Sequence, residues 1–389
     1  MAHTAAVEDG ALAAREGRLI FVGPTDVCDR LIETAPGATV LDASGCAVVP
    51  GFVDPHTHLV FAGDRRGELG RRLAGATYSQ IAAEGGGILA TVAATRKAGL
   101  DDLVALARPR LAEMLRCGTT TAEAKSGYGL TVGDELKMLR AMRALEGSQP
   151  VELVSTFMGA HEVPPEFRDD PEAYVDLVVD RMLPAVVDER LAEWNDVFCE
   201  RGVFTPAQST RILEAGRRLG LQARIHANEL GETGGAQVAA RVGARSADHL
   251  VFLGDDDIAA LARAGVVATL LPTAAFYLKL GQYAPARRLI EAGVPVALAT
   301  DVNPGGGFSP SMPFAMTLAC FAMGLTFEES LNAATANAAY ALDRHERVGS
   351  LEPGKQCDAV IVGGPATELL RVGADAIVGV IKRGTVAGG

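Results

Sequence analysis

Two periods of apolar residues alternate along most of the chain after residue 47. Short β-branched runs are followed by longer stretches in which apolar residues recur at helical spacing, which is typical of repeated βα units. Several of the short runs are apolar on both faces, as expected for strands buried on both sides. The predicted strands cover residues 47–58, 119–127, 151–161, 195–200, 221–229, 246–252, 266–276 and 295–301.

Amphipathic stretches such as residues 103–118 and 206–220 separate these strands, and Gly220 is a plausible C-terminal cap of the second. Eight strands alternating with helices predict an α/β fold built as a (β/α)8 TIM-like barrel. A doubly wound open sheet is the alternative, but no GxGxxG turn follows the first strand. Residues 85–87 are three glycines without the GK[ST] sequence of a phosphate loop, so the barrel is favoured.

Both ends of the chain depart from this alternation. Residues 1–47 and 348–389 contain short strand signals separated by turns instead of long helical stretches. We therefore expect a small β-sandwich domain formed from both chain termini, with the barrel occupying residues 48–347.

Composition and charge limit which binding partners and which cellular compartment we expect. The chain has 36 basic and 48 acidic residues and a net charge of −12, which argues against nucleic acid as a partner. The six cysteines form no CxxC motif, and the N-terminus lacks the apolar core of a signal peptide. The most apolar window, residues 264–278, is interrupted by Pro272 and too short to cross a membrane. We expect a cytoplasmic protein that binds neither nucleic acid nor membranes.

Histidines concentrate where the predicted strands end. The chain has seven histidines, and His56, His58, His161, His226 and His249 all fall at strand ends. A single HxH sequence could equally be two solvated loop histidines, but five such positions together indicate a functional site at a barrel mouth. His56 and His58 are two residues apart on a strand, so their side chains point the same way.

Three of these histidines and one carboxylate form a candidate metal shell. His56, His58, His226 and Asp301 would hold one Zn²⁺ or Fe²⁺/Fe³⁺ ion per subunit, a donor set that suits zinc and iron equally. This shell leaves room for a water, whose pKa an ion would lower toward about 7.

Neighbouring residues supply candidate acid–base groups. Glu229 lies on the same turn as His226, where it could move the water's proton to a leaving nitrogen with help from Asp301. His249 could polarise a carbonyl oxygen opposite the metal. These residue types predict metal-assisted hydrolysis.

The motifs that carry these residues resemble the metal-dependent amidohydrolase superfamily. They are PGFVDPHTH, HANE, ADHL and ALATD, in that order. The resemblance implies a distorted TIM barrel with a small β-sandwich built from both chain ends. Many two-metal members have a carboxylated lysine at the end of the fourth strand. Residues 195–202 contain no lysine, so a single metal ion is expected.

Further segments are similar to one family within it, the imidazolonepropionases of histidine degradation. They are LVFAGDR, GGGILATVAATR, TTTAEAKSGYGL, TFMGAHEVP and ATDVNPG, and the similarity extends over nearly the whole chain. It implies hydrolysis of 4-imidazolone-5-propanoate to N-formimidoyl-L-glutamate, a small-molecule substrate that carries a carboxylate. A homodimer is a family expectation only.

The resemblance also implies a set of substrate contacts. Arg65 would clamp the propionate, since a guanidinium binds a carboxylate bidentately, and Tyr128 and His161 would meet the ring. The full set of expected substrate-binding residues is Arg65, Tyr128, His161, Glu229, Asn303, Gly305 and Gly306. The family usually has a hydroxyl residue where this chain has Gly306, so a backbone N–H would replace that contact or the contact would be missing.

Two other functions remain open. A superfamily deaminase acting on a guanine- or cytosine-like base would share the His, Glu and Asp set but would have no use for Arg65. An inactive structural member that assembles into oligomers is the second alternative. Such members have usually lost metal ligands, whereas this chain keeps every one that the shell requires.

Overall fold

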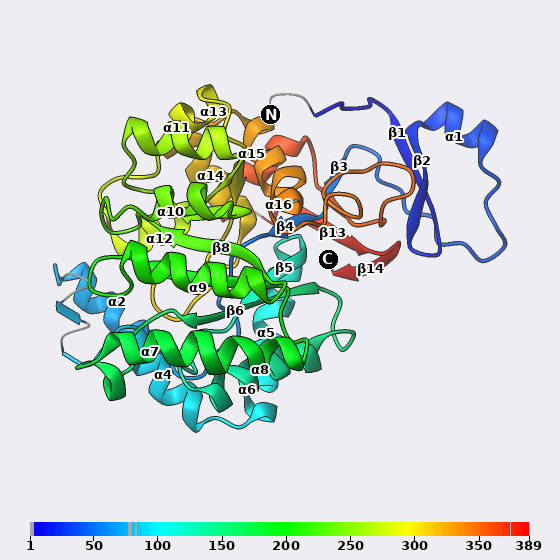
Figure 1. Ribbon diagram of the computed structural model, residues 1–389. Helices are drawn as coiled ribbons and strands as arrows, with labels where there is room; N and C mark the ends of the chain where they lie inside the picture. The colour runs from blue at the N-terminus through cyan, green and yellow to red at the C-terminus, as the bar shows by residue number, and fades with distance from the viewer. Residues whose placement is uncertain (1–3, 77–79, 82–83, 374, 389) are drawn as a thin grey trace.

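An eight-stranded parallel sheet forms the centre of the protein (Figure 1). The structure is a computed structural model, and it describes residues 4–76, 80–81, 84–373 and 375–388. Neighbours in the sheet follow chain order, as in the predicted α/β barrel, whose fold class is confirmed. The strands are β4 (Phe52–Asp54), β5 (Thr119–Lys125), β6 (Glu152–Ala160), β7 (Trp194–Cys199), β8 (Gln222–Ala227), β9 (Ser246–His249), β10 (Val267–Leu270) and β11 (Val296–Leu298).

Backbone hydrogen bonds beyond the last strand bring the two edges of this sheet together. Thr57 and Val302 form an isolated parallel bridge. The His58 N–H donates to the Val302 carbonyl at 2.8 Å, and the Asp301 N–H donates to the His56 carbonyl at 3.1 Å. The sheet therefore closes at the carboxyl ends of its strands, using the backbone of the predicted metal ligands.

Helices surround the barrel and connect its strands (Figure 1). Pro206 and the Thr205–Gln208 capping box begin α9, and Gly220, with φ of 95°, follows its end as predicted. The α-helices are α1 (Thr25–Leu31), α2 (Arg66–Leu73), α4 (Ile88–Lys97), α5 (Leu100–Arg116), α6 (Val132–Leu145), α7 (Pro171–Leu177), α8 (Leu183–Asp188), α9 (Pro206–Arg218), α10 (Gly235–Val242), α11 (Asp255–Ala264), α12 (Pro272–Leu278), α13 (Ala286–Glu291), α14 (Met312–Met323), α15 (Phe327–Ala334) and α16 (Ala336–Ala341). Short turns of other helix types are η1 (Pro165–Phe167), η2 (Val178–Met182) and η3 (Ala366–Leu370).

Three predicted strands end differently in the structure. The segment 47–58 contains two short strands that belong to different sheets, with Gly51 between them. The segment 266–276 stays extended only to Leu270, because Pro272 takes the first turn of α12. The strand predicted over 246–252 ends at His249, which places that histidine at the carboxyl end of β9.

Strands from both chain ends form a small antiparallel sheet, in the order β14-β13-β12-β3. The N-terminal strand β3 is an edge of this sheet and pairs with β12, with Ala359 opposite Pro50 and Val362 opposite Ala47. A separate hairpin, β1 with β2, lies beside α1 at the right of Figure 1. These strands are β1 (Gly10–Arg15), β2 (Arg18–Pro24), β3 (Ala47–Pro50), β12 (Ala359–Val362), β13 (Ile377–Lys382) and β14 (Thr385–Gly388).

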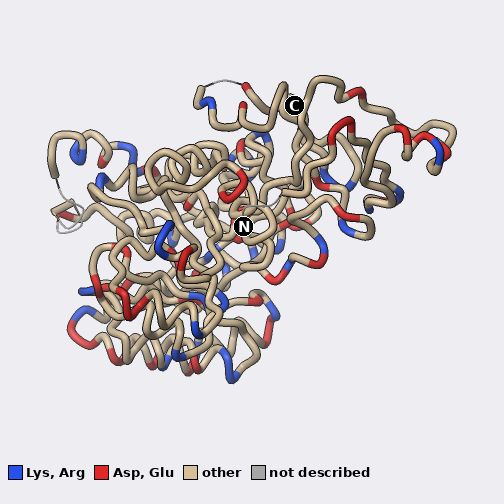
Figure 2. Tube along the Cα trace, turned by 90° about the horizontal axis from the view of Figure 1, so that it is seen from above, with Lys and Arg blue, Asp and Glu red and all other residues tan. Residues whose placement is uncertain are grey.

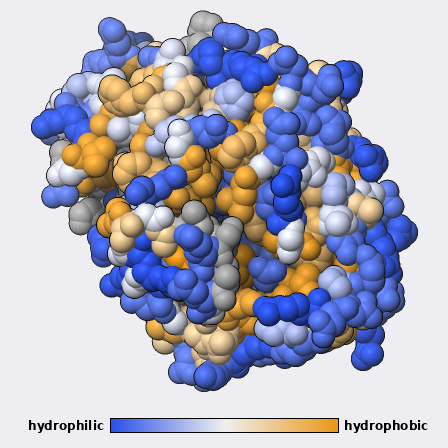
Figure 3. Space-filling view, turned by 90° about the vertical axis from the view of Figure 1, so that its left-hand side faces the viewer, coloured by the Kyte–Doolittle hydropathy of each residue, from blue (hydrophilic) through white to orange (hydrophobic). Residues whose placement is uncertain are grey.

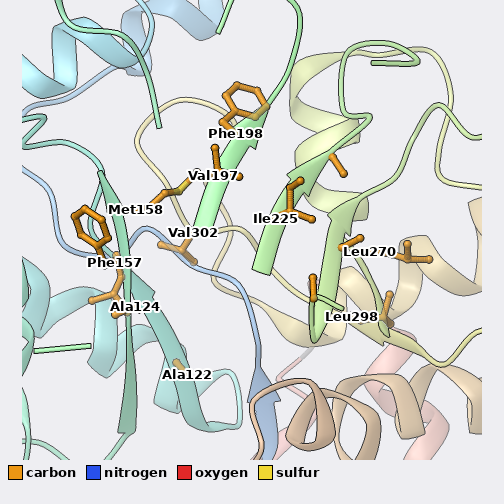
Figure 4. Close-up of a cluster of buried hydrophobic side chains, with 14 of the residues drawn as sticks. Ala122, Ala124, Phe157, Met158, Val197, Phe198, Ile225, Leu270, Leu298 and Val302 are labelled. Carbon is orange, nitrogen blue, oxygen red and sulfur yellow. The ribbon is translucent and has the colours of Figure 1, made fainter. Parts of the chain in front are cut away.

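Apolar side chains fill the interior between sheet and helices. Phe157 and Met158 from β6 lie near Val197 and Phe198 from β7 in the cluster drawn in Figure 4. A second buried cluster joins the strands to α16 and consists of Val53, Val154, Trp194, Val267, Ala297, Ala338, Ala339, Ala341, Leu342 and Val348.

Charged residues of both signs are interspersed along the outside of the molecule (Figure 2). On the side where α2 lies, hydrophobic residues gather around the middle of the face, with hydrophilic residues at its periphery (Figure 3). None of the helices in the described residues combines the length and apolar character needed to cross a lipid bilayer.

Candidate metal centre and active site

The predicted metal ligands converge at one point of the barrel mouth. His56 and His58 follow β4, His226 lies in β8, and Asp301 follows β11. The Nε2 atoms of His58 and His226 are 3.2 Å apart. Asp301 Oδ1 lies 3.7 Å from His56 Nε2 and 3.8 Å from His58 Nε2.

These separations fit a metal ion. A tetrahedral ion with bonds of about 2.0–2.1 Å would place its ligand atoms about 3.3 Å apart. Two overlapping groups, His56–His58–Asp301 and His56–His226–His249, bring their ligand atoms within 4.8 Å of one another. His56 Nε2 is buried without a hydrogen-bond partner, as expected of an atom placed to bind an ion. The barrel thus holds a His/Asp metal site.

Burial favours the neutral form of several imidazoles at the site. Burial, together with the neighbouring Lys125 and other imidazoles, lowers the pKa of His56 well below its ordinary value. Burial likewise lowers the pKa of His58 and His249, and it brings the pKa of His161 to about 3. Neutral imidazole is the ligand form for zinc and iron.

Two carboxyl groups at the mouth have raised affinities for protons. Burial, with a smaller contribution from Asp54, raises the pKa of Asp301 to about 8. Burial, then repulsion by Asp301 and Glu200, raises the pKa of Glu229 well above its ordinary value. A cation at the ligand atoms would favour ionised Asp301, while the raised pKa of Glu229 makes it hold a proton more readily than an ordinary carboxylate does.

A network of buried charges supports the ligands from behind. Asp248 Oδ2 lies 2.7 Å from His56 Nδ1, and Asp196 Oδ1 lies 3.1 Å from His226 Nδ1. Lys125, the last residue of β5, donates to Asp196 in β7. Sequence reasoning did not identify this layer, although charged residues within otherwise apolar strands were a visible signal.

A cavity of about 530 Å³, including the open space at its entrance, lies in front of the ligands. Ten of the predicted site residues line it: His58, Arg65, Tyr128, His161, His226, Glu229, His249, Asp301, Asn303 and Gly306. His56 lies behind this lining and is fully buried. The apolar wall, formed by Ile88, Phe198, Leu230 and Leu278, was not predicted, because apolar residues at these places look like ordinary core.

Arg65 lies in the cavity wall with its orientation set by a carboxylate. Its Nε and one terminal nitrogen donate to Glu68 of α2 at 3.0 and 2.9 Å. Glu68 also accepts the Gly87 N–H at 2.9 Å. The Arg65 side chain is only 6% exposed and lines the cavity.

The loop after Asp301 is held in shape by the side chain of Asn303, one of its own residues. Asn303 Nδ2 donates to the Asp301 carbonyl at 2.8 Å, while its Oδ1 accepts the N–H groups of Gly305 and Gly306 at 2.8 and 2.6 Å. The Gly306 N–H, considered above as a replacement for a missing hydroxyl, is therefore engaged within the loop. Gly305 does not line the cavity; it packs directly against the Arg65 guanidinium.

Two aromatic residues face the ligands across the cavity. The His161 ring stacks on His58 with centroids 4.8 Å apart and planes 16° apart. Tyr128 lies 5.2 Å from His161, centroid to centroid. The loop that carries Tyr128 is held by the buried Glu135 carboxylate, which accepts the N–H groups of Gly127, Gly129 and Leu130 at 3.0, 2.8 and 2.9 Å.

Comparison with known proteins agrees with this geometry. Residues 47–389 match the model of the amidohydrolase family. The chain is 53% identical to an imidazolonepropionase of Symbiobacterium thermophilum, over 99% of this chain and 91% of the relative. It is 51% identical to an imidazolonepropionase of Geobacillus kaustophilus, over 94% and 86%. Among solved structures, an adenosine deaminase from Xanthomonas campestris with bound zinc superposes with a TM-score of 0.74 at 20% identity, covering 98% of this chain and 89% of the other.

Proposed function

This chain belongs to the amidohydrolase family and, within it, to the imidazolonepropionases, and we infer that it hydrolyses the cyclic amide of 4-imidazolone-5-propanoate to N-formimidoyl-L-glutamate. Water adds to the ring carbonyl carbon, the carbon–nitrogen bond breaks, and the departing nitrogen takes a proton. The observation that carries this inference is one cavity whose walls include both the His/Asp cluster and Arg65.

One metal ion fits the cluster, and we propose His56, His58, His226 and Asp301 as its ligands. Zinc and iron both accept three imidazoles and a carboxylate, and zinc is supported by the fold neighbour that was solved with zinc bound. When bound, the ion would supply an activated water and polarise the ring carbonyl.

Glu229 and His249 are the proposed acid–base groups. Glu229 Oε1 lies 3.6 Å from His249 Nδ1, and both residues line the cavity. The raised pKa of Glu229 suits a carboxylate that takes a proton from water and returns it to the departing ring nitrogen. His249 would orient the carbonyl oxygen through a hydrogen bond, and Asp301 would assist the proton transfer.

Substrate recognition is assigned to the opposite wall. Arg65 would bind the propionate, because it is the buried guanidinium that lines the cavity. His161 and Tyr128 would flank the ring. Asn303, Gly305 and Gly306 would act mainly through the loop that shapes the Arg65 side of the site.

We also propose a cellular location and an assembly state. The six cysteines are free thiols, in keeping with the reducing cytoplasm that we propose as the protein's location. A homodimer is proposed from family membership alone, and sedimentation of the purified protein would test it.

The proposed function is tested by following the loss of imidazolone absorbance with wild type, Arg65→Gln and Arg66→Gln. Arg66 is the matched control, since it adjoins Arg65 in the chain but its side chain is 83% exposed. Loss of a buried charged hydrogen bond costs about 2–5 kcal/mol, so we expect KM to rise at least about 30-fold for Arg65→Gln only.

Three results would contradict parts of the proposal. Equal KM values for the two variants would remove Arg65 from substrate binding. Turnover of guanine or cytosine in place of the imidazolone would favour a deaminase. Absence of a bound ion, with no hydrolysis after addition of Zn²⁺ or Fe²⁺, would favour an inactive structural member.

A further inference from the structure

Lys125 is a fully buried cation that is not among the residues lining the cavity. It is the last residue of β5, and its side chain has no exposed surface. Its Nζ lies 2.6 Å from Asp196 Oδ2, 2.9 Å from Glu123 Oε1 and 3.8 Å from Asp248 Oδ2. Placing an ammonium among three carboxylates away from water is costly unless these groups are paired, so the arrangement calls for a functional reason.

Two of these carboxylates, those of Asp196 and Asp248, each place an oxygen beside the Nδ1 atom of a proposed metal ligand. Asp196 uses Oδ2 for Lys125 and Oδ1 for His226 Nδ1, at 3.1 Å, and for the His226 backbone N–H, at 3.2 Å. Asp248 Oδ2 faces His56 Nδ1 at 2.7 Å. When Nδ1 donates to a carboxylate, the lone pair is left on Nε2, and in both histidines Nε2 is the atom that faces the proposed ion.

The remaining partners complete the network. Arg224 lies 3.3 Å from Asp248 Oδ2 and 3.2 Å from Glu123 Oε1, and Ser246 donates to Asp248 Oδ1 at 2.6 Å. These contacts join Lys125, Arg224 and the carboxylates of Glu123 and Asp248 into one layer behind the proposed ligands.

We propose that Lys125 is a positioning residue of the metal site: its ammonium holds Asp196, and through the shared cluster Asp248, in the orientation that turns Nε2 of His226 and of His56 toward the same ion. The inference rests on the proposed ligand set. In many two-metal members of the superfamily a lysine is carboxylated. A carbamate on Lys125 would be negatively charged and would be repelled by the three carboxylates around it. Lys125 therefore acts as an ammonium.

The test measures metal binding by the full-length chain after removal of metal with a chelator. Lys125→Met keeps most of the length of the side chain and removes its charged end. Lys137→Met is the control, because Lys137 is a partly buried lysine of α6 that bonds to Asp134 and the Arg96 carbonyl instead. Co²⁺ titration followed by visible absorption reports both affinity and coordination geometry, and competition with a chelator gives the affinity for Zn²⁺.

We expect Lys125→Met to bind Co²⁺ and Zn²⁺ about 10–100-fold more weakly, the usual effect of losing an outer partner of a ligand, with an altered Co²⁺ spectrum. Lys137→Met should match wild type. If folded Lys125→Met binds both ions as wild type does, with the same spectrum, the proposal is overturned. A wild-type chain that binds no divalent ion would instead overturn the proposed function.

A second variant covers the case in which Lys125→Met does not fold. Asp196→Asn keeps the shape of the carboxylate but presents an amide to His226 and Lys125, and it should weaken metal binding to the same extent. Where both single variants fold, the double variant should be little worse than either one, because Lys125 acts through Asp196. Additive losses, or an unchanged affinity in Asp196→Asn, would overturn the proposal.

Discussion

Gly305→Ala is the substitution whose effect follows most directly from the structure. A Cβ at Gly305 would lie 2.5 Å from each terminal nitrogen of Arg65, whereas ordinary contacts begin at 3.4 Å. The guanidinium or the loop must therefore move by about 0.9 Å. The φ angle at Gly305 is outside the left-handed region, so the new methyl group, and not backbone strain, is the whole perturbation.

A shift of this size would separate Arg65 from its partners. Its two hydrogen bonds to Glu68 are 3.0 and 2.9 Å long, so moving the guanidinium by that distance leaves at least one of them broken. A hydrogen bond to a charged group is worth about 1.5–3 kcal/mol, or about 10–100-fold in an equilibrium constant. Because Arg65 is assigned to the propionate and not to the reacting carbon, we expect KM to rise by that factor with kcat nearly unchanged.

The assay is steady-state loss of imidazolone absorbance, with Gly70→Ala as the control. Gly70 lies in α2, beside the same arginine, but a Cβ there meets nothing within 4 Å. Alanine should make that helix more stable by up to about 1 kcal/mol and leave both kinetic constants as in wild type. An unchanged KM in Gly305→Ala, or a fall in kcat at constant KM, would refute the reasoning, since the loop and not Arg65 would then have absorbed the shift.

Two other expectations concern the buried Glu135 and the half-buried Glu152. Glu135→Gln should lower the free energy of unfolding by about 1–3 kcal/mol and raise KM, because an amide cannot accept all the N–H groups of the Tyr128 loop; unchanged urea midpoint and KM would contradict this. Burial would raise the pKa of Glu152, but Lys382, Arg347 and Arg383 outweigh it and lower that pKa. The Glu152 stabilisation is therefore present above pH 4.5, the unfolded value, and lost as pH falls through the folded pKa. Glu152→Gln should lose about 1 kcal/mol at pH 7 and nothing in strong acid; a urea-unfolding difference that persists at low pH would argue against it.

The sequence pattern predicts the barrel well, because its strands and helices have different periods and follow one another in order. It cannot separate β3 from β4, since the apolar run 47–53 passes from one sheet to the other without a polar break. Gly51 marks the change, where a Cβ would lie 2.5 Å from Thr120 Oγ1. That contact joins residues distant in sequence and leaves no local signal.

The residues of the site also differ in whether the sequence alone could identify them. Residues at strand ends, such as His226, can be found from position alone, because the carboxyl ends of barrel strands meet. Glu68 and Glu135 could not, since a glutamate in a helix normally faces solvent, and only the fold shows that these two hold Arg65 and the Tyr128 loop. The charge of Lys125 within an apolar strand was visible, but its role was not, because Asp196 and Asp248 come from other strands.

The motifs at the strand ends are short because a few residues there both contribute side chains to the site and adopt the backbone conformation that the strand ends require. Asn228, His249 and Asp301 have φ angles of 52°, 75° and 54°, in the left-handed region that Asn, Asp and His enter several-fold more often than other non-glycine residues. Such a backbone costs about 1–3 kcal/mol per residue unless its surroundings hold it. Asn228 is held by its own side chain, which accepts the Ala236 N–H and donates to the Phe252 carbonyl. Asp301 and His249 each adopt this left-handed backbone and also place their own side chain in the barrel mouth. A single residue type therefore suits both the backbone conformation and the site.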